Sequence, residues 1–340
     1  MKNKNIQDII YKLINQNNLS EEETFEVFNS IMSGNINDIQ VSGFLTALSA
    51  KGETVSEITG GVKLLKNKML SINSPSNAID TVGTGGDGLG TYNISTACAF
   101  VVSSLGIPIA KHGNRSVTSK SGASDVLKEL GVNIEAEIHI IEKSLNEINI
   151  TFLNAPKHHP TMKNVATVRK DLGVRTIFNL LGPLVNPANV NRQLIGVYNH
   201  NLLDKFAQVL NNLGTKHSWV VHGSDGLDEI TTTGKTFVAE VFENKIRKFE
   251  INPENYGITL TKIQNLVGGT PKENATAIID LFNGKKNSYR DIVTINSAAA
   301  ILISGKSKSI EEGIALANKS LDNGLAMNSL KKLINFTNNK

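Results

Sequence analysis

Five glycines within eight residues constrain this chain more than any other feature. The segment reads Asp80-Thr-Val-Gly-Thr-Gly-Gly-Asp-Gly-Leu-Gly90, between an apolar run and a helical pattern. Glycine adopts positive φ at little steric cost, so such a loop can turn its amide N–H groups toward a ligand. Together with the N-terminus of a following helix, these groups suit a phosphate. A glycine-rich stretch that only forms a turn is the alternative reading of this segment.

The same loop matches the dinucleotide-binding pattern G-x-G-x-x-G over residues 83–88. That pattern requires an acidic residue about twenty positions later to hold a ribose hydroxyl. The chain has Pro108-Ile-Ala-Lys-His-Gly113 there, and a lysine is unsuited to that role. Asp87 inside the loop repels phosphate unless a sugar hydroxyl or a metal lies between them. We therefore expect a sugar phosphate rather than a dinucleotide.

A second polar cluster spans residues 111–122, with the sequence KHGNRSVTSKSG. Its cations, hydroxyls and amide cannot lie in a core, because too many polar groups would need partners. Lysine, arginine and hydroxyl side chains are suited to a second phosphate group. A solvated basic loop is the alternative interpretation.

Alternating short apolar runs and helical patterns predict an α/β fold with a mostly parallel sheet covered by helices. The expected strands are residues 79–82, 107–110, 150–153, 194–198 and 219–221, and the expected helices are about 93–105, 122–130, 137–147 and 201–213. Residues 236–242 and 245–251 read as a hairpin, and the last hundred residues return to helices.

The first seventy residues predict only helices. Ser20 with Glu23, and Thr54 with Glu57, are capping-box patterns that start two of them. Apolar residues at helical spacing mark two further helices: Ile6, Ile9, Ile10, Leu13 and Ile14, then Ile39, Val41, Phe44, Leu45 and Leu48, with Gly52 as a stop. These apolar faces can cover one another or a partner subunit.

Composition excludes several classes of protein. The 340 residues are 40% hydrophobic and 19% charged, which is the balance of a globular chain long enough for two domains. The single cysteine, Cys98, excludes a disulfide framework and fits a cytoplasmic location. No apolar run reaches about 18 residues and the start shows no secretory pattern, so we expect no membrane partner. A net charge of +4 suits small anionic substrates and gives little support for nucleic-acid binding.

Several motifs in order closely resemble the anthranilate phosphoribosyltransferase family. They are GTGGD (83–87), NISTA (93–97), KHGNRSV (111–117), SDVLKELGV (124–132), HPTMKNVATVRKDLGVRTIFNLLGPLVNPA (159–188), DGLDEI (225–230) and GGTPKENA (268–275). The resemblance covers nearly the whole chain. It implies a helical domain, 1–72 with a return segment at about 165–185, and an α/β donor-binding domain, 73–340. It also implies a homodimer formed through the helical domain.

The resemblance implies transfer of a phosphoribosyl group from phosphoribosyl pyrophosphate to the amino group of anthranilate, in tryptophan biosynthesis, with two Mg2+ ions. The implied donor-binding residues are Gly83, Gly86, Asp87, Thr91, Asn93, Ile94, Ser95, Thr96, Lys111, His112, Gly113, Asn114, Arg115, Ser116, Val117, Thr118, Ser119 and Ala123. The implied anthranilate contacts are Gly83, Asn114, His159 and Arg169, and the implied metal ligands are Ser95, Asp228 and Glu229. We assign no catalytic base, because an aromatic amine is already neutral at physiological pH.

One position departs from the family pattern, which has a serine where this chain has Ala123. Ser124 carries a hydroxyl one residue later, but one helical residue turns a side chain by about 100°. The departure puts one donor contact in doubt.

Other readings stay open at single positions and for the whole chain. Without the family resemblance, Arg169 is interpreted as one member of an exposed ion pair. Asp228-Glu229 is then interpreted as surface charge, and His159 as a helix-start residue. A pyrimidine nucleoside phosphorylase would share the fold but lacks the GTGGD and HPTMKNVATVR patterns. A nucleic-acid-binding paralogue would have degraded motifs and a basic groove, and the sequence has neither.

Overall fold

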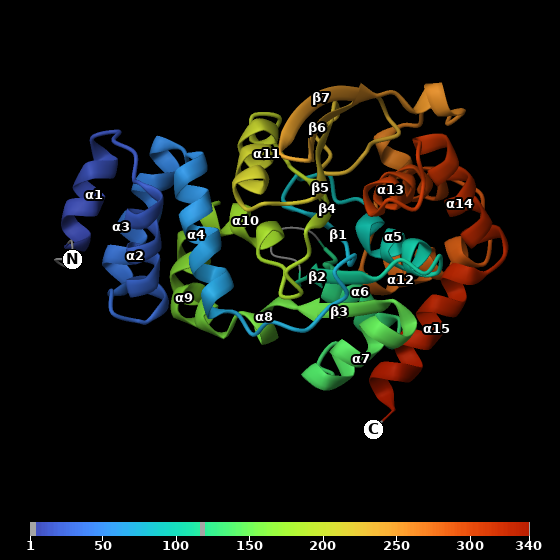
Figure 1. Cartoon of the computed structure of the whole chain (residues 1–340), viewed down its shortest axis with the longest axis horizontal. Coiled ribbons are helices and arrows are strands. Elements are labelled where there is room, and N and C mark those ends of the chain that lie inside the picture. Colours follow the sequence, from blue (N-terminus) through green and yellow to red (C-terminus); the bar gives the residue numbers. More distant parts are fainter. Residues whose placement is uncertain (1–4, 116–119, 340) are drawn as a thin grey trace. The chain divides into compact units, whose positions relative to one another are not determined.

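The chain divides into two compact units in the computed structural model, which describes residues 5–115 and 120–339. The helical unit comprises residues 1–71 and 156–187, and the α/β unit comprises 72–155 and 188–340. Figure 1 labels the helices and strands of both. No helix among the described residues is long and apolar enough to cross a membrane.

The helical unit is built from short capped helices. They are α1 (Ile6–Ile14), α2 (Glu21–Met32), α3 (Asp38–Lys51), α4 (Val55–Lys68), α9 (Lys163–Leu172) and α10 (Ile177–Leu181), with 3-10 turns at Pro160–Met162 and Gly182–Leu184. The predicted capping boxes at Ser20 and Thr54 are both present. Each lets a side-chain oxygen accept a backbone N–H that the helix start leaves without a partner.

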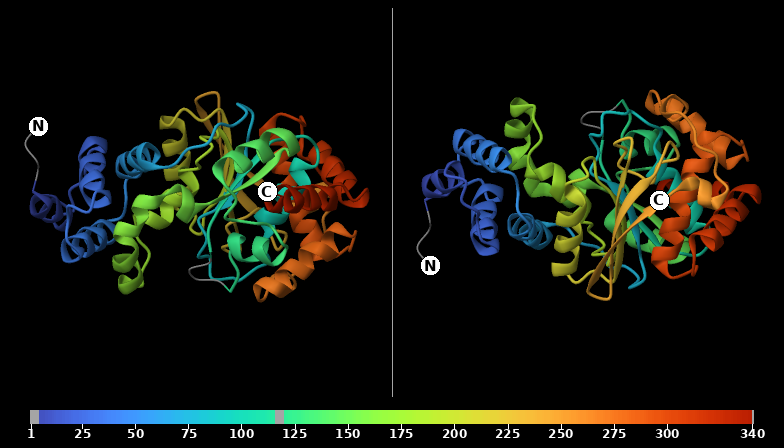
Figure 2. Two further views of the ribbon diagram at one scale, coloured as in Figure 1. Left: turned by 90° about the horizontal axis from the view of Figure 1, so that it is seen from below. Right: turned by 90° about the horizontal axis from the view of Figure 1, so that it is seen from above.

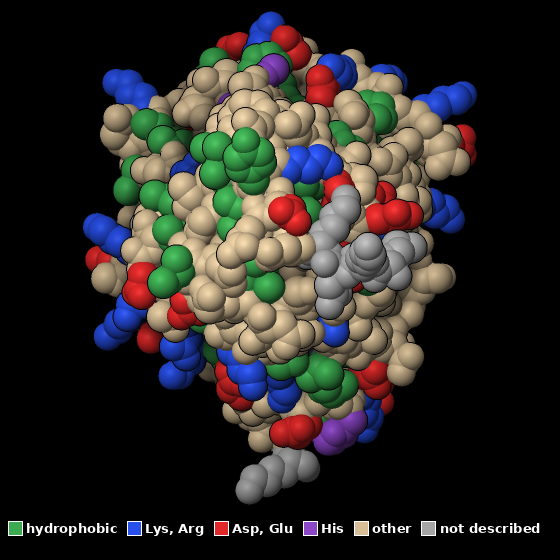
Figure 3. All heavy atoms as spheres, turned by 90° about the vertical axis from the view of Figure 1, so that its left-hand side faces the viewer, with side chains coloured by type: hydrophobic (Ala, Val, Ile, Leu, Met, Phe, Trp, Pro, Cys, Tyr) green, Lys and Arg blue, Asp and Glu red, His purple; other side chains and the backbone are tan. Residues whose placement is uncertain are grey.

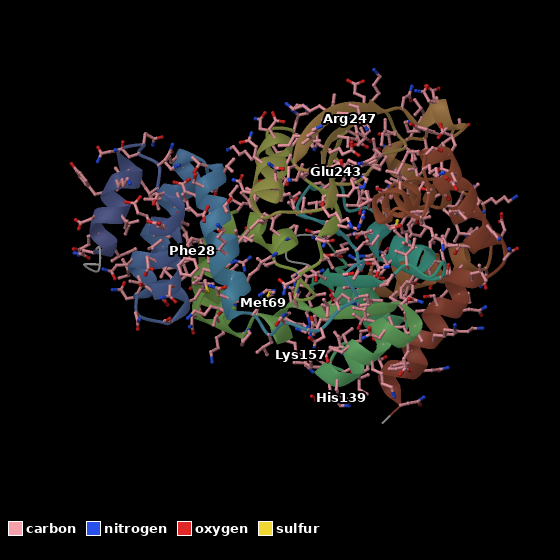
Figure 4. All side chains as sticks on the ribbon, viewed as in Figure 1. Phe28, Met69, His139, Lys157, Glu243 and Arg247 are labelled. Carbon is pink, nitrogen blue, oxygen red and sulfur yellow. The ribbon has the colours of Figure 1, made fainter. Side chains whose placement is uncertain are left out.

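Aromatic packing closes the core of this unit. Phe28 of α2 is fully buried, and its ring lies 5.8 Å from that of Phe44 and 5.4 Å from that of Phe178 (Figure 4). The prediction that Ile39 shares the apolar face of α3 is wrong, since Ile39 is 85% exposed. Val41 lies two residues on, and two helical steps rotate a side chain by about 200°, so Ile39 points the other way.

The return segment of the helical unit runs over residues 156–187 and thus begins before the predicted 165. A pair of contacts explains the earlier start: the Leu70 N–H donates to the His158 carbonyl at 2.7 Å, and the His158 ring Nδ1 lies 2.7 Å from the Leu70 carbonyl. The periodicity of a sequence does not predict contacts between residues that are this far apart in the chain.

The α/β unit is organised on parallel strands. The strands are β1 (Asp80–Gly83), β2 (Ile109–Gly113), β3 (Ile150–Asn154), β4 (Arg192–Gly196), β5 (His217–Gly223), β6 (Thr236–Phe242) and β7 (Lys245–Ile251). The sheet order is β1-β4-β5-β6-β7, and a parallel bridge between Ile79 and Ile109 sets the β2-β3 pair beside β1. Strands β1 to β5 pair in parallel, whereas β6 and β7 form the predicted hairpin, where Glu243 and Arg247 lie (Figure 4).

Helices cover both faces of these strands. They are α5 (Ile94–Ser103), α6 (Ala123–Glu129), α7 (Ile138–Ile148), α11 (Leu202–Asn212), α12 (Pro271–Phe282), α13 (Ser288–Ser304), α14 (Ile310–Asp322) and α15 (Leu325–Asn338), with 3-10 turns at Pro253–Tyr256 and Ile263–Asn265. The short helix α8 (Ala155–His158) spans the point in the sequence where the return segment of the helical unit begins. Figure 2 shows α13 to α15, in orange to red, packed as one group. Leu194, Trp219 and Val238 of the sheet pack in one cluster with Ile295 of α13. Because parallel strands end at the same edge, the residues that follow β1, β2, β4 and β5 meet there.

Candidate active site

The glycine loop leaves β1 at Gly83 and is bound to the neighbouring strand. Gly85, Gly86, Gly88 and Gly90 all have positive φ, between 61° and 79°. L side chains adopt this conformation with strain, which explains the glycines. The Thr84 N–H donates to the Gly196 carbonyl at 2.9 Å, which holds the loop at the carboxyl end of β4.

The end of β2 lies beside the end of β1, so the two polar segments of the sequence meet. The Lys111 Nζ donates to the Thr81 carbonyl at 2.7 Å, and the His112 N–H donates to Asp80 Oδ1 at 3.2 Å. Lys111 is only 4% exposed, and burial lowers its pKa although Asp80 and Glu229 lie close enough to raise it. Its ammonium group is thus a buried counter-charge to carboxylates at this edge. Residues 116–119 of the predicted second segment lie outside the described residues.

The start of α6 packs tightly on the end of β2. Ser124 donates its backbone N–H to the Asn114 carbonyl at 3.2 Å, and its Oγ donates to Asn154 Oδ1 at the same distance. Ser124 is fully buried, so its hydroxyl is committed to the carboxyl end of β3. It therefore does not replace the hydroxyl that Ala123 lacks.

Asp228 and Glu229 follow β5 and lie next to the glycine loop. The Gly85 N–H donates to Asp228 Oδ2 at 2.7 Å, and the Ser95 N–H donates to Glu229. Loss of solvation is the main cause that raises the pKa of Asp228 to about 7, with Asp87 the next. The pKa of Glu229 rises to about 8, first through loss of solvation and then through Asp228. Reading this pair as ordinary surface charge is therefore wrong.

The loop that carries this pair is held on both sides. Asp225 Oδ2 accepts from the Thr231 and Thr233 hydroxyls at 2.7 and 2.6 Å. Asn296 of α13 accepts from the Ile230 N–H at 2.9 Å and donates to the Ile230 carbonyl at 2.8 Å. Asn296 is fully buried, so it clamps the backbone directly after Glu229. Sequence patterns alone assigned no role to these two residues. Asp225 lies within the DGLDEI motif, and Asn296 lies shortly before an alanine run.

The chemistry of these oxygens fits Mg2+ bound partly by substrate. The described residues contain no group of three or more His, Cys, Asp or Glu side chains that could hold a metal ion. Asp228, Glu229 and the Ser95 hydroxyl therefore offer only part of a ligand shell. Mg2+ usually keeps waters and takes phosphate oxygens, so an incomplete oxygen shell suits it. A cation would also offset the loss of solvation and the repulsion that together raise both carboxyl pKa values.

Two of the four implied anthranilate contacts, His159 and Arg169, belong to the helical unit. The other two, Gly83 and Asn114, belong to the α/β unit. His159 immediately precedes the 3-10 turn Pro160–Met162, as the helix-start reading expected. It is 6% exposed, and burial is the first cause that lowers its pKa to about 4, so the ring is neutral at physiological pH.

Arg169 lies on α9 with its guanidinium carbon 5.3 Å from the centre of the Phe178 ring. The described ion pairs include none between Arg169 and Asp171, so the exposed ion-pair reading of Arg169 is wrong. Burial lowers the Arg169 pKa, and an incoming carboxylate would offset this loss of solvation.

Family models match both units. A model described as "Glycosyl transferase family, helical bundle domain" covers residues 7–69, and one described as "Glycosyl transferase family, a/b domain" covers residues 75–327. Among similar curated proteins, the anthranilate phosphoribosyltransferase of Bradyrhizobium diazoefficiens is 48% identical over 98% of this chain and 99% of its own length. That of Rhodospirillum rubrum is 49% identical over 93% of this chain and 91% of its own.

Solved structures are similar over the same extent. The anthranilate phosphoribosyltransferase of Thermus thermophilus matches with a TM-score of 0.92 and 37% identity, over 98% of this chain and all of its own. The Saccharomyces cerevisiae enzyme in complex with PRPP and Mg matches with a TM-score of 0.90 and 30% identity, over 98% and 97%. The same yeast enzyme in complex with 4-fluoroanthranilate matches with a TM-score of 0.89 and 28% identity, over 98% and 97%.

Proposed function

This chain belongs to the anthranilate phosphoribosyltransferase family, and from that premise we propose which of its residues carry out the reaction. The enzyme transfers the phosphoribosyl group of phosphoribosyl pyrophosphate to the amino group of anthranilate, releases pyrophosphate, and uses magnesium. The step serves tryptophan biosynthesis. The observation that carries the residue assignment is the meeting of the β1 and β2 ends with Asp228 and Glu229 at one sheet edge.

The donor is held mainly by backbone groups. The glycine loop and the first turn of α5 present N–H groups to its phosphates, as helix starts do for anions. Gly83, Gly86, Asp87, Thr91 and Asn93 to Thr96 line this part of the donor site, with Asp87 facing the ribose rather than a phosphate. The implied residues from Lys111 to Ser119, with Ala123, line the remainder.

Cations stabilise the negative charge that develops on the departing pyrophosphate. Mg2+ would be held by Asp228, Glu229 and the Ser95 hydroxyl, and it supplies positive charge where the leaving group becomes more negative. We propose two such ions. The positive charge of Lys111 offsets part of the negative charge of the buried carboxylates. It therefore reduces their repulsion of the donor phosphates.

Anthranilate is oriented rather than activated. Arg169 binds its carboxylate, and His159, Gly83 and Asn114 complete the acceptor contacts. The neutral His159 ring adds no charge of its own. Because the amine is already neutral, most of the acceleration comes from holding it in line with the ribose carbon that loses pyrophosphate.

The active form is proposed to be a cytoplasmic homodimer. Among the exposed large apolar side chains of the helical unit are Tyr11, exposed by 71%, Ile14 by 61% and Ile39 by 85%. They lie on α1 and α3, which pack against each other. Exposed apolar side chains gathered on neighbouring helices are typical of an interface.

A fluorescence assay tests the proposal directly. Loss of anthranilate fluorescence should require both phosphoribosyl pyrophosphate and Mg2+, and chelation should stop it. Titration with single-stranded DNA is the counter-test. Tight, salt-sensitive DNA binding with no response to the donor would overturn the assignment.

A further inference from the structure

The motif GGTPKENA (268–275) belongs to the family resemblance, but the proposed function uses none of its residues. In the structure it runs beside the end of the glycine loop. The Gly268 N–H donates to the Gly90 carbonyl at 2.9 Å, and Thr91 forms an antiparallel bridge with Val267. The motif therefore adjoins the segment that enters α5.

Each part of this motif has a local structural reason. Thr270 and Glu273 form the capping box that starts α12, with Pro271 at its first position. This start places Asn274, 1% exposed, next to the glycine loop. A side chain on Gly268 would collide with Asn274 and with the Thr91 carbonyl, so only glycine lets the two segments approach this closely.

Asn274 joins the motif to Asn93 through both of its amide atoms. Its Oδ1 accepts from the Gly269 N–H at 2.8 Å, and its Nδ2 donates to Asn93 Oδ1 at 2.9 Å. Asn93 Oδ1 also accepts from the Ser121 hydroxyl at 3.1 Å, and Asn93 Nδ2 donates to the Ser121 carbonyl at 3.3 Å. Asn93 therefore links three segments that are distant in sequence.

This use of Asn93 is unusual for its position. Asn93 is the N-cap of α5, where an asparagine oxygen ordinarily accepts from an N–H of the first turn. Here it makes no such capping bond. Ser121 and Asn274 occupy that oxygen instead, so the start of α5 has no cap from its own side chain.

We propose that Asn274 is a positioning residue for donor binding, acting through Asn93. The Ile94 N–H of the first turn already donates to the Tyr92 carbonyl at 2.8 Å, and the Ser95 N–H donates to Glu229. Asn274 holds the Asn93 oxygen away from the remaining first-turn N–H, that of Thr96, and so keeps this group available for a donor phosphate. It also fixes the α5 start against Ser121, at the end of the second donor segment. Asn274 itself touches no reacting atom, and the inference rests on the donor site proposed above.

Initial rates with Asn274→Leu, Asn93→Ala and the double variant test this inference. Loss of the Asn274 bond frees the Asn93 oxygen to cap α5 in competition with phosphate. We expect the donor KM of Asn274→Leu to rise about tenfold, the effect of one hydrogen bond near a charged ligand. The anthranilate KM should stay within about twofold. The double variant should be no worse than Asn93→Ala, because contacts in one network are not additive.

Two further variants keep the test decisive. Ser121→Ala removes the other holder of the Asn93 oxygen with little risk to folding, and it should also raise the donor KM. Ser329→Ala, which removes a buried bond to Ser103 of 2.7 Å, is the control: it should lower the melting temperature without changing the donor KM. An unchanged donor KM in both Asn274→Leu and Ser121→Ala, or equal rises in both KM values, would overturn the inference. A wild-type enzyme without transfer would instead refute the proposed function.

Discussion

The raised pKa values of Asp228 and Glu229 predict that this pair lowers the stability of the fold at neutral pH when no cation is bound. Their pKa values, about 7 and 8, lie above the ordinary values of carboxyl groups. A carboxyl whose pKa is raised by folding binds protons more tightly in the folded state. The free energy of unfolding therefore falls as the pH rises from about 4 through 8, unless a cation replaces the protons.

Neutralising the pair should separate stability from activity. Asp228→Asn with Glu229→Gln should cripple turnover and abolish the magnesium dependence, while the chain stays folded. In EDTA at pH 8 the double variant should melt a few °C above wild type, since it has neither the poorly solvated charges nor their repulsion. The difference should shrink toward pH 5. Thermal melts across this range give the readout, with exposed Asp280→Asn as control, and a difference independent of pH contradicts the argument.

Replacing Arg169 should affect the acceptor alone. A charged hydrogen bond to anthranilate carboxylate contributes about 1.5–3 kcal/mol, so Arg169→Ala should raise the anthranilate KM by roughly ten- to a hundredfold. The donor KM should change little. Lys170→Ala, an exposed cation on the same helix, is the matched control. Equal effects on the two KM values would mean that Arg169 has another role.

At the scale of elements, the site depends on how closely the β5–β6 loop approaches the end of β4. A Cβ on Gly196 would overlap the Asp228 backbone, so glycine alone permits this approach. We predict that Gly196→Ala displaces Asp228 and lowers turnover by about a hundredfold, as misplaced catalytic groups do. Gly182→Ala is the control, because a Cβ at Gly182 meets no atom within 4 Å. Steady-state rates at saturating magnesium compare the two, and near-wild-type turnover of Gly196→Ala would show that the loop can shift without loss.

At the scale of the whole molecule, the exposed apolar side chains of α1 and α3 predict self-association. Figure 3 shows hydrophobic side chains among charged ones on the face that it presents. Tyr11→Glu with Ile39→Glu should convert a dimer to a monomer, because buried carboxylates lack partners. Ile246→Glu, on the hairpin of the α/β unit and 39% exposed in the wild type, should leave the mass unchanged. Light scattering after gel filtration measures the mass, and a dimer that survives the first change refutes this interface.

Local patterns predicted most elements because local physics decides them. The capping boxes at Ser20 and Thr54 and the hairpin strands 236–242 and 245–251 are confirmed at the predicted residues. Each depends on groups within a few residues of one another. The early start of the return segment was missed because it depends on contacts between Leu70 and His158.

The same distinction between local and long-range interactions applies to the site. Glycine content and residue types alone indicated that the loop after β1 is suited to phosphate, whereas the metal role of Asp228-Glu229 was implied only by the family resemblance and stays a prediction. Only the tertiary structure decided that Ser124 turns to Asn154, that Lys111 is buried beneath the edge, and that Asn296 and Asn274 support the site. A backbone conformation is local and can be read from glycines. The partner of a buried amide depends on which distant strand or helix lies beside it, and packing of the whole unit sets that neighbour.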